Sequence, residues 1–255
     1  MKHPIGVFDS GVGGLSILRA LHAELPCEDF VYVADSAHAP YGERDPDFVV
    51  ERSRHIARLL VEDQPLPVKA LVVACNTATA AAIHLLRSDY PGLPIIGVEP
   101  ALKPALALSQ TRRIGVMATR ATLNSPKFLA LQRSLSDRAI FVCQPCDGLA
   151  DAIERHDTAK IVALCADYTG AMGVFGQQAH EIDTLVLGCT HYPFAVDHLT
   201  RLLGPAVQLV SNGTPVARQT RRVLPHLAAP CLEGTVTLQS TGDHLSLVQA
   251  AKRWL

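Results

Sequence analysis

The chain has 255 residues, of which 48% are hydrophobic and 18% are charged, and its formal net charge is −1. This balance is typical of a globular protein with a large core and excludes the high-charge, low-hydrophobicity class of disordered chains. Lys and Arg occur as scattered pairs and do not form a basic stripe, so we do not expect nucleic acid as a partner.

The chain shows no sign of export or membrane insertion. The apolar run before Asp9 is too short for a signal-peptide core, and no apolar stretch approaches the ~20 residues that span a bilayer. We therefore expect a cytoplasmic protein without membrane contact, whose seven cysteines are thiols and not a disulfide framework. A homodimer is compatible with the sequence, which does not reveal the oligomeric state.

Short apolar runs alternate with longer helix-forming stretches, which indicates a mainly parallel sheet covered by helices. Strands are predicted at Ile5–Phe8, Phe30–Ala34, Ala70–Ala74, Ile95–Val98, Ile114–Ala118, Ala139–Cys143, Thr184–Gly188, Ala206–Val210 and Thr235–Leu238. Helices are predicted at Leu15–Leu25, Asp47–Glu62, Thr77–Ser88 and Ser125–Leu135, the last with Asn124 or Ser125 as its N-cap and Pro126 in its first turn.

A weak internal duplication runs through the chain. Residues 5–10 (IGVFDS) resemble residues 114–119 (IGVMAT), and residues 71–77 (LVVACNT) resemble residues 185–191 (LVLGCTH), at offsets of 109 and 114 residues. The order is the same in both halves, so the sequence predicts two similar α/β units fused in tandem.

The duplication also predicts where two cysteines lie. Ligands bind at the carboxyl ends of the strands in open parallel sheets, so Cys75 and Cys189 should each lie at such an edge, and a pseudo-twofold would set them face to face. The first domain is expected to comprise residues 1–98 and 209–255, and the second residues 99–208.

Cys75 and Cys189 are each followed by small polar residues, at 76–77 and 190–191. A buried cysteine is usually an apolar filler, but filler rarely has such neighbours, and helix N–H groups after a strand favour a thiolate. Two facing thiols suit the inversion of a carbon acid, in which one group removes a proton and the other delivers one to the opposite face. A redox pair is the less favoured alternative.

Cys143 and Cys146 form a lone CxxC motif. It lacks the second CxxC or His pair of a zinc site, and no thioredoxin-type helix pattern follows it at once. We interpret both cysteines as structural and expect no metal.

Residues 9–14 (DSGVGG) follow a strand and open a helix, as in the glycine-rich turn that binds dinucleotides. Two features argue against a dinucleotide, because Ser16 replaces the third glycine and Asp9 would repel a pyrophosphate. Asp35 nevertheless imitates the ribose-binding acid, so a nucleotide-binding oxidoreductase is kept as an alternative. We favour a small ligand whose carboxylate is received by Ser10 and helix N–H groups, with Asp9 holding an ammonium or tuning a thiol.

Three further residues have ordinary alternatives. Tyr41, followed by Gly42, lies in a turn signal and is interpreted either as a plain loop or as a close ligand contact. His191 is either a satisfied buried histidine or a general acid or orienting partner beside a thiol. Glu154 would ordinarily be a solvated helix carboxylate.

Together, these motifs resemble the glutamate racemases of the aspartate/glutamate racemase superfamily. The resemblance runs from residue 5 to about 194 and rests on residues 9–16, 40–42, 74–78, 97–100 and 188–194. It implies two flavodoxin-like three-layer α/β/α domains with mainly parallel sheets, related by a pseudo-twofold, with the active site in the cleft between them.

The resemblance also implies a reaction and a set of site residues. The reaction is a cofactor-independent interconversion of L- and D-glutamate that supplies D-glutamate for peptidoglycan, with Cys75 deprotonating D-glutamate and Cys189 deprotonating L-glutamate. Asp9, His191 and Glu154 would assist, although Asp151 or Asp157 could be mistaken for Glu154. The implied substrate-binding residues are Asp9, Ser10, Tyr41, Gly42, Asn76, Thr77, Thr119, Thr122, Thr190 and His191.

Two alternatives stay open beside this resemblance. An aspartate racemase of the same superfamily would share the thiol pair, which does not fix the length of the substrate side chain. A non-catalytic interaction protein could retain an old racemase fold.

Overall fold

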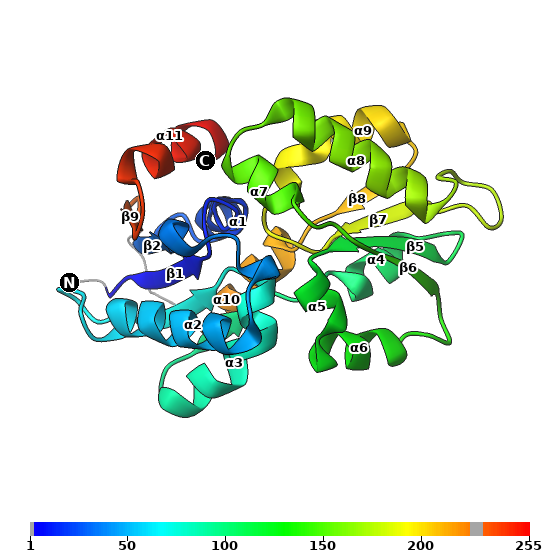
Figure 1. The fold of residues 1–255 in the computed structure, drawn as a ribbon. Coiled ribbons are helices and arrows are strands. Elements are labelled where there is room, and N and C mark those ends of the chain that lie inside the picture. Colours follow the sequence, from blue (N-terminus) through cyan, green and yellow to red (C-terminus); the bar gives the residue numbers. More distant parts are fainter. Residues whose placement is uncertain (1–2, 225–231) are drawn as a thin grey trace. The chain divides into compact units, whose positions relative to one another are not determined.

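The computed structural model describes residues 3–224 and 232–255. The chain divides into two compact units, unit 1 (residues 1–98 and 213–255) and unit 2 (residues 99–212) (Figure 1). Unit 2 extends past the boundary at residue 208 that the sequence suggested, because β8 (Gln208–Val210) pairs along its length with β7 (Thr184–Leu187).

Unit 1 is built on a five-stranded sheet in the order β4-β3-β1-β2-β9, and all its strand pairs are parallel. The strands are β1 (Ile5–Asp9), β2 (Phe30–Ala34), β3 (Ala70–Val73), β4 (Ile95–Gly97) and β9 (Val236–Ser240). In this register Asp9 pairs with Ala34 and Phe8 with Val73. The residues that follow β1, β2 and β3 therefore lie at one edge of the sheet.

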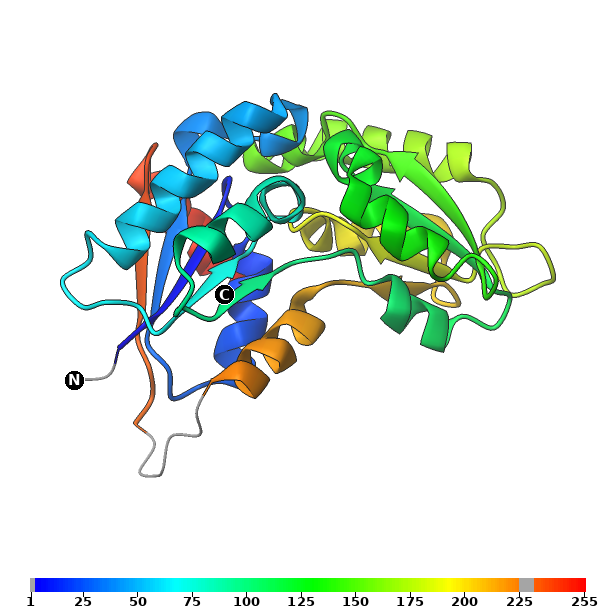
Figure 2. The same cartoon turned by 90° about the horizontal axis from the view of Figure 1, so that it is seen from below.

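Helices cover both faces of this sheet, with α2 and α3 packed together on one side and α1 and α10 on the other (Figure 2). The helices of unit 1 are α1 (Leu15–Glu24), α2 (Pro46–Val61), α3 (Asn76–Asp89), α10 (Gly213–Val223) and α11 (His244–Trp254), with the 3-10 turns η1 (Ser36–His38) and η2 (Tyr41–Glu43). The α2 helix begins where Asp45 accepts the N–H of Asp47, with Pro46 in the first turn.

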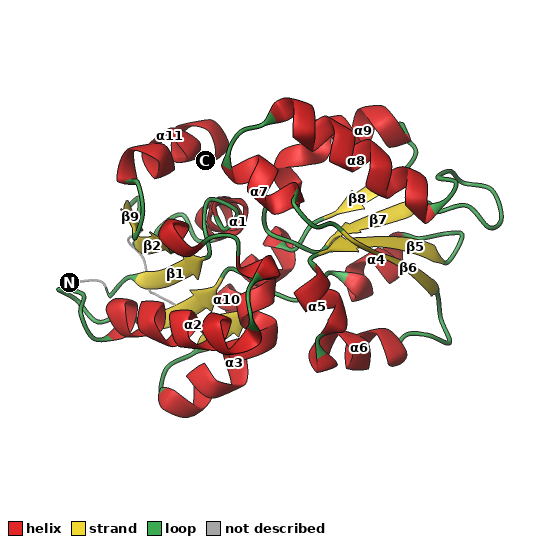
Figure 3. Cartoon of the chain, in the orientation of Figure 1, coloured by secondary structure: helices red, strands yellow, loops and turns green. Residues whose placement is uncertain are grey.

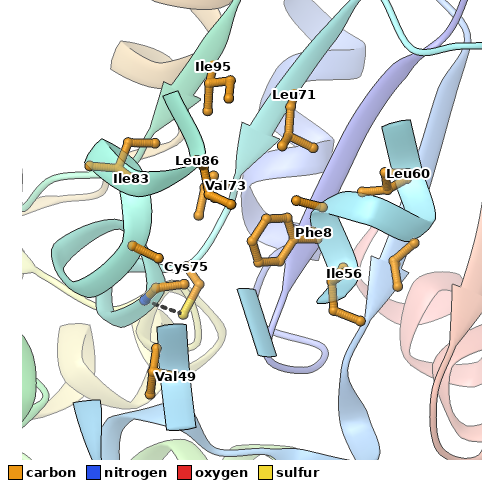
Figure 4. Packing of buried hydrophobic residues seen from close by; sticks show 14 of the residues in the cluster. Phe8, Val49, Ile56, Leu60, Leu71, Val73, Cys75, Ile83, Leu86 and Ile95 are labelled. Carbon is orange, nitrogen blue, oxygen red and sulfur yellow. Dashed lines mark hydrogen bonds between the residues drawn. The ribbon is translucent and has the colours of Figure 1, made fainter. Parts of the chain in front are cut away.

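The face under α2 and α3 forms a continuous apolar core. Phe8 and Val73 of the sheet pack with Ile56 of α2 and Leu86 of α3, and all four are fully buried (Figure 4). Burying such a side chain stabilises the fold by ~1.5–3 kcal/mol. Cys75 belongs to the same cluster, so its position is fixed by the core.

Unit 2 repeats this topology. Its parallel sheet has the order β6-β5-β7-β8, built from β5 (Arg113–Ala118), β6 (Ile140–Pro145), β7 and β8 (Figure 3). If β5 to β8 are matched with β1 to β4, the order is that of unit 1 without its edge strand β9. The predicted duplication is therefore present in the strand topology. The first four strands of each sheet follow the flavodoxin-like order 2-1-3-4, whereas the fifth strand of unit 1, β9, lies beside β2.

Helices also lie on both faces of the second sheet. One face packs against α4 (Leu102–Leu108), α5 (Arg120–Asn124) and α6 (Pro126–Arg133), and the other carries α8 (Thr158–Met172), whose Met172 lies close to Gly115 of β5. The remaining elements are α7 (Leu149–Glu154), η3 (Tyr192–Ala195) and α9 (Val196–Leu203). Ser125 is the N-cap of α6, where its Oγ accepts the N–H of Phe128 at 3.1 Å.

Two sequence-based expectations receive different outcomes. All nine predicted strands are present, with ends shifted by a few residues. The expectation that every cysteine is a thiol is wrong for Cys27, which is disulfide-bonded, whereas Cys75, Cys143, Cys146, Cys165 and Cys189 are free. Within residues 3–224 and 232–255, no helix is both long enough and apolar enough to cross a membrane.

Candidate active site

Cys75 lies directly beyond β3 and caps α3. Its Sγ accepts the backbone N–H of Ala78 at 3.4 Å (Figure 4), and the residue is 5% exposed. The adjoining turn is fixed by Thr79, whose Oγ1 accepts the N–H of Val98 at 3.0 Å and donates to the carbonyl of Val73 at 3.2 Å. The sulfur is therefore held at the amino end of a helix, where N–H groups stabilise negative charge.

The glycine-rich loop after β1 folds around Asp9. Oδ1 of Asp9 accepts hydrogen bonds from the N–H of Gly11 at 2.8 Å and from the hydroxyl of Ser10 at 3.2 Å. A Cβ at Gly14 would lie 2.5 Å from Cβ of Asp9 and 2.7 Å from Oη of Tyr32, so no side chain fits there. The glycine is therefore needed for close packing beside a buried carboxylate.

Tyr41 is fully buried, and its hydroxyl donates to Oδ2 of Asp35 at 2.5 Å. Burial and the nearby Asp35 carboxylate together raise the pKa of Tyr41 far above its ordinary value, so the phenol stays protonated. Its hydroxyl is thus used inside the protein, which leaves the backbone of Tyr41 and Gly42 as the part of this turn that a ligand could contact.

Asp35 is also fully buried, and both of its oxygens accept hydrogen bonds. Burial alone would raise its pKa, but donors led by Arg52 and Tyr41 lower the pKa to about 2. The carboxylate is therefore turned into the protein, which disfavours the ribose-binding role considered for a nucleotide-binding oxidoreductase.

Cys189 occupies the corresponding position in unit 2, just after β7, and is 6% exposed. The N–H of Gly188 donates to the carbonyl of Met117 at 2.7 Å, and a Cβ on Gly188 would lie 2.9 Å from that oxygen. Glycine is thus required directly before this thiol. Sγ of Cys189 lies 3.6 Å from Nδ1 of His191.

His191 links Cys189 to a carboxylate. Its Nε2 lies 2.5 Å from Oε1 of Glu154, the last residue of α7, and the imidazole is 2% exposed. Burial disfavours the charged ring, but its hydrogen bonds to Cys189 and Glu154 prevail and raise the pKa of His191 well above its ordinary value. The chain from Sγ through the imidazole to the carboxylate can therefore hold a proton next to the sulfur.

Only one of the three candidate acids near α7 contacts His191. Asp151 pairs with Arg155 at 2.8 Å, and Asp157 caps α8 by accepting the N–H of Lys160 at 3.0 Å. Glu154 is therefore the acid that the fold directs to the imidazole, a choice that the sequence left open.

Buried hydroxyl groups complete the predicted set. Thr119 follows β5, and its Oγ1 accepts the N–H of Thr122 at 3.2 Å and donates to that residue's Oγ1 at 2.9 Å. Thr77 is 5% exposed and Thr190 2% exposed, each directly beyond the asparagine or cysteine of its strand-end motif. Unit 1 thus contains Asp9, Ser10, Tyr41, Gly42, Cys75, Asn76 and Thr77, and unit 2 contains Thr119, Thr122, Glu154, Cys189, Thr190 and His191.

The two cysteines of the CxxC motif lie in different environments. Cys146 is 2% exposed. Burial is the larger cause that raises its pKa, and the charge of the nearby Cys189 raises the pKa further. Cys143 is half-buried beside a cavity of about 260 Å³, and burial raises its pKa to about 11. In the described part of the chain, no group of three or more His, Cys, Asp or Glu residues could hold a metal ion.

Sequence reasoning missed the residues around Asp35. Its partners His38, Arg52 and Thr241 lie on three segments, and Thr241 is 206 residues away in the chain. The only available signal was Asp35 itself, an acid directly after a buried strand, and that position suggested a nucleotide instead.

Comparison with known proteins adds a family and close relatives. Residues 5–219 match the family model described as Asp/Glu/Hydantoin racemase. A glutamate racemase from Ralstonia nicotianae is 47% identical over 248 residues, which cover 96% of this chain and 86% of the relative.

Solved structures of similar proteins agree with the fold. A crystal structure of a glutamate racemase isoform from Bacillus anthracis matches with a TM-score of 0.84 at 31% identity, covering 99% of this chain and 93% of the other. A glutamate racemase from Francisella tularensis in complex with D-glutamate matches with a TM-score of 0.81 at 27% identity, covering 100% and 94% of the two chains.

Proposed function

The chain belongs to the Asp/Glu/Hydantoin racemase family, and on that premise we propose that it interconverts L- and D-glutamate. The observation that supports this most strongly is the pair of strand-end thiols, one in each unit of a duplicated fold. The relative from Ralstonia nicotianae bears the name glutamate racemase, and the structure from Francisella tularensis contains D-glutamate.

The proposed reaction needs one proton removed and one delivered. In the D-to-L direction the Cys75 thiolate takes the α-proton, so a C–H bond breaks and an S–H bond forms. The Cys189 thiol then gives its proton to the opposite face of the carbanion, and in the L-to-D direction the roles reverse. No atoms or electrons are gained or lost, so the proposed step needs no co-reactant.

The difficult part is the carbanion, because an amino-acid α-carbon is a far weaker acid than a thiol. Fixed N–H and hydroxyl donors around the developing charge lower this barrier, and positioned acids and bases contribute about 10²–10⁴-fold each. We propose that Ser10, Asn76 and Thr77 of unit 1 and Thr190 of unit 2 supply such donors. All four residues are buried, and Asn76, Thr77 and Thr190 lie within two residues of a thiol in the sequence.

The unit 2 thiol has a built-in proton partner. A protonated His191 next to Sγ of Cys189 can stabilise the thiolate before it removes the α-proton, and Glu154 orients the imidazole from the other side. We propose that His191 and Glu154 assist the deprotonation of L-glutamate in this way.

The remaining residues are proposed to select the substrate. Asp9 lies on the strand next to β3 and would hold the ammonium group or assist Cys75. The Tyr41–Gly42 turn would contact the ligand through its backbone, and Thr119 and Thr122 would contact the side-chain carboxylate. The product D-glutamate would enter peptidoglycan synthesis.

Circular dichroism tests the activity and the substrate together. Purified protein without added cofactor is mixed with L- and D-glutamate and, in parallel, with L- and D-aspartate. Loss of optical activity with both glutamate enantiomers supports the proposal, and loss only with aspartate would favour the aspartate racemase alternative. Saturable NAD binding without α-proton exchange would favour an oxidoreductase.

Two expectations are separate from the reaction and stay predictions. They are a cytoplasmic location and a homodimer. Cell fractionation and light scattering, respectively, test them.

A further inference from the structure

A buried carboxylate lies beside the Cys75 region without belonging to the residues proposed above. We call Asp35, His38, Tyr41, Arg52 and Thr241 the Asp35 cluster. Asp35 accepts hydrogen bonds from Oη of Tyr41 at 2.5 Å, Nε and Nη2 of Arg52 at 2.9 Å each, Oγ1 of Thr241 at 2.7 Å and Nδ1 of His38 at 3.0 Å.

These donors come from four segments of unit 1. His38 and Tyr41 lie in η1 and η2, Arg52 lies on α2, and Thr241 directly follows β9. A carboxylate that is 0% exposed is costly to bury unless its charge is paired and its lone pairs are filled. Asp35 meets both conditions, so it fixes the turn that contains Tyr41 to the rigid sheet and to α2.

The fixed turn adjoins the thiol. The ring of Tyr41 belongs to the same buried cluster as Cys75, and η2 packs against α3, the helix that Cys75 caps. The charge of Cys75 is also among the influences on the Tyr41 phenol. A displacement of Tyr41 would therefore reach the packing around Cys75.

Unit 2 offers a buried carboxylate with a purely local use. Asp183 is 5% exposed and accepts the hydroxyl of Ser109 at 2.7 Å and the N–H groups of Gln110 at 2.6 Å and Thr111 at 2.9 Å. It closes a turn just before β5, at the end of the sheet opposite to the thiol. Asp35 differs because one of its donors is a residue of the proposed site.

We propose that Asp35 is a positioning residue for the racemase reaction and that it acts through Tyr41, holding the Tyr41–Gly42 turn against the Cys75 region. This inference rests on the proposed function for its kinetic consequence. Its structural consequence, that Asp35 and Tyr41 act on Cys75 as one unit, can be measured without turnover.

The test is a double-mutant cycle on the full-length enzyme, with Asp35→Asn, Tyr41→Phe and the double variant. Two quantities are measured: kcat/KM for D-glutamate, and the ratio of iodoacetamide alkylation rates at Cys75 and Cys189 by mass spectrometry. Cys189 is the internal reference because it lies in the other unit. Coupled residues share one effect, whereas independent residues have additive free-energy effects.

We expect each single variant to lower kcat/KM about tenfold and to raise the Cys75 to Cys189 ratio by a similar factor. The double variant should differ little from either single variant. Effects that multiply in the double variant would overturn the proposal, as would an unchanged alkylation ratio in the folded single variants.

Asp183→Asn is the matched control, since it removes another buried charge, 5% exposed against 0% for Asp35, from a local turn. It should lower the melting temperature without changing the alkylation ratio. Any effect of Asp183→Asn on kcat/KM should multiply with that of Tyr41→Phe in the double variant, because the two residues are independent. A ratio raised as much by Asp183→Asn as by Asp35→Asn would also contradict the proposal, because general loosening would then explain both.

Thr241→Val covers the case in which Asp35→Asn does not fold, since it removes only one of the donors. It should raise the alkylation ratio by a smaller factor, and this rise should disappear in the Tyr41→Phe background. A rise that persists in that background would overturn the proposal. If the wild-type enzyme does not racemise glutamate, the proposed function fails, while the alkylation ratios still decide whether Asp35 acts through Tyr41.

Discussion

The two cysteine sites share a backbone arrangement but differ in what touches the sulfur. In unit 1 the N–H of Ala74 donates to the carbonyl of Phe8 at 2.7 Å, and in unit 2 the N–H of Gly188 donates to the carbonyl of Met117 at 2.7 Å. Each bond joins the residue before the cysteine to the neighbouring strand. The duplication has thus kept the position of the thiol at the strand end.

The surroundings of the two sulfurs have diverged. Sγ of Cys75 accepts a helix N–H, whereas Sγ of Cys189 lies beside an imidazole that is itself bonded to Glu154. A repeated backbone therefore fixes where the candidate acid or base lies, while side chains on other elements determine which groups support it. The two thiols should therefore respond differently when their neighbours are changed.

The largest effect is expected from removing either thiol. Cys75→Ala and Cys189→Ala should each lower kcat by at least about 10³-fold. Each thiol is the proposed base in one direction of racemisation and the proposed acid in the other, so its loss should slow both directions. The measurement is racemisation of both glutamate enantiomers by circular dichroism. Cys143→Ala is the control and should retain normal turnover, since Cys143 lies beside a cavity lined by none of the proposed site residues. Near-normal racemisation by either active-site variant would contradict the two-thiol mechanism.

His191→Asn should break the symmetry between the two thiols. It removes the ring next to Cys189 and should lower kcat about 10²-fold, with unchanged folding. The primary deuterium isotope effect should increase more with α-deuterated L-glutamate, for which Cys189 is the proposed base, than with the D enantiomer. Equal changes in both directions would mean that His191 supports both thiols or only substrate binding.

Gly188→Ala should disturb the unit 2 thiol through the backbone. The added Cβ would lie 2.9 Å from the carbonyl oxygen of Met117, so the strand end has to move, at a cost of about 1–3 kcal/mol in the free energy of unfolding. Gly92→Ala is the matched control, because a Cβ there meets nothing within 4 Å. Urea unfolding and kcat are measured for both variants, and equal stability of the two would show that the close contact at Gly188 is relieved without strain.

The smallest effect is a pH dependence of stability from Asp35. Its pKa is about 2 in the folded chain against the ordinary 3.8, so the folded state binds this proton less readily than the unfolded state. The resulting stabilisation, about 2 kcal/mol, is present above pH ~4 and is lost as the pH falls towards 2. The difference in the free energy of unfolding between wild type and Asp35→Asn, measured by urea unfolding, should therefore be about 1 kcal/mol smaller at pH 3 than at pH 7, and a constant difference would contradict the assignment.

The sequence predicted the strands of both sheets and part of the helices. Buried parallel strands are continuous apolar runs, so all nine were visible, and proline or polar caps marked four helices. The helix α8 was not predicted because its apolar and small residues show little periodicity. The bond at Cys27 was missed because the expected cytoplasmic location favoured thiols over disulfides.

The positions of Cys75 and Cys189 at strand ends were predictable, because each lies in a short local motif. The candidate site was not predictable where partners come from distant segments. Nothing local distinguishes Glu154 from Asp151 before α7 is placed beside His191. Asp35 likewise looked like a nucleotide-binding acid until Arg52 and Thr241 were seen to fill its lone pairs.

The most direct test of the two-thiol mechanism follows the isotope at the α-carbon. L-Glutamate is mixed with the enzyme in D₂O, and both enantiomers are separated and analysed by NMR or mass spectrometry before much product forms. Because the thiol that delivers the proton has equilibrated with solvent, the D-glutamate formed should contain deuterium while the remaining L-glutamate retains its proton. D-Glutamate that retains the original proton, or L-glutamate that gains deuterium as fast as product forms, would contradict the mechanism.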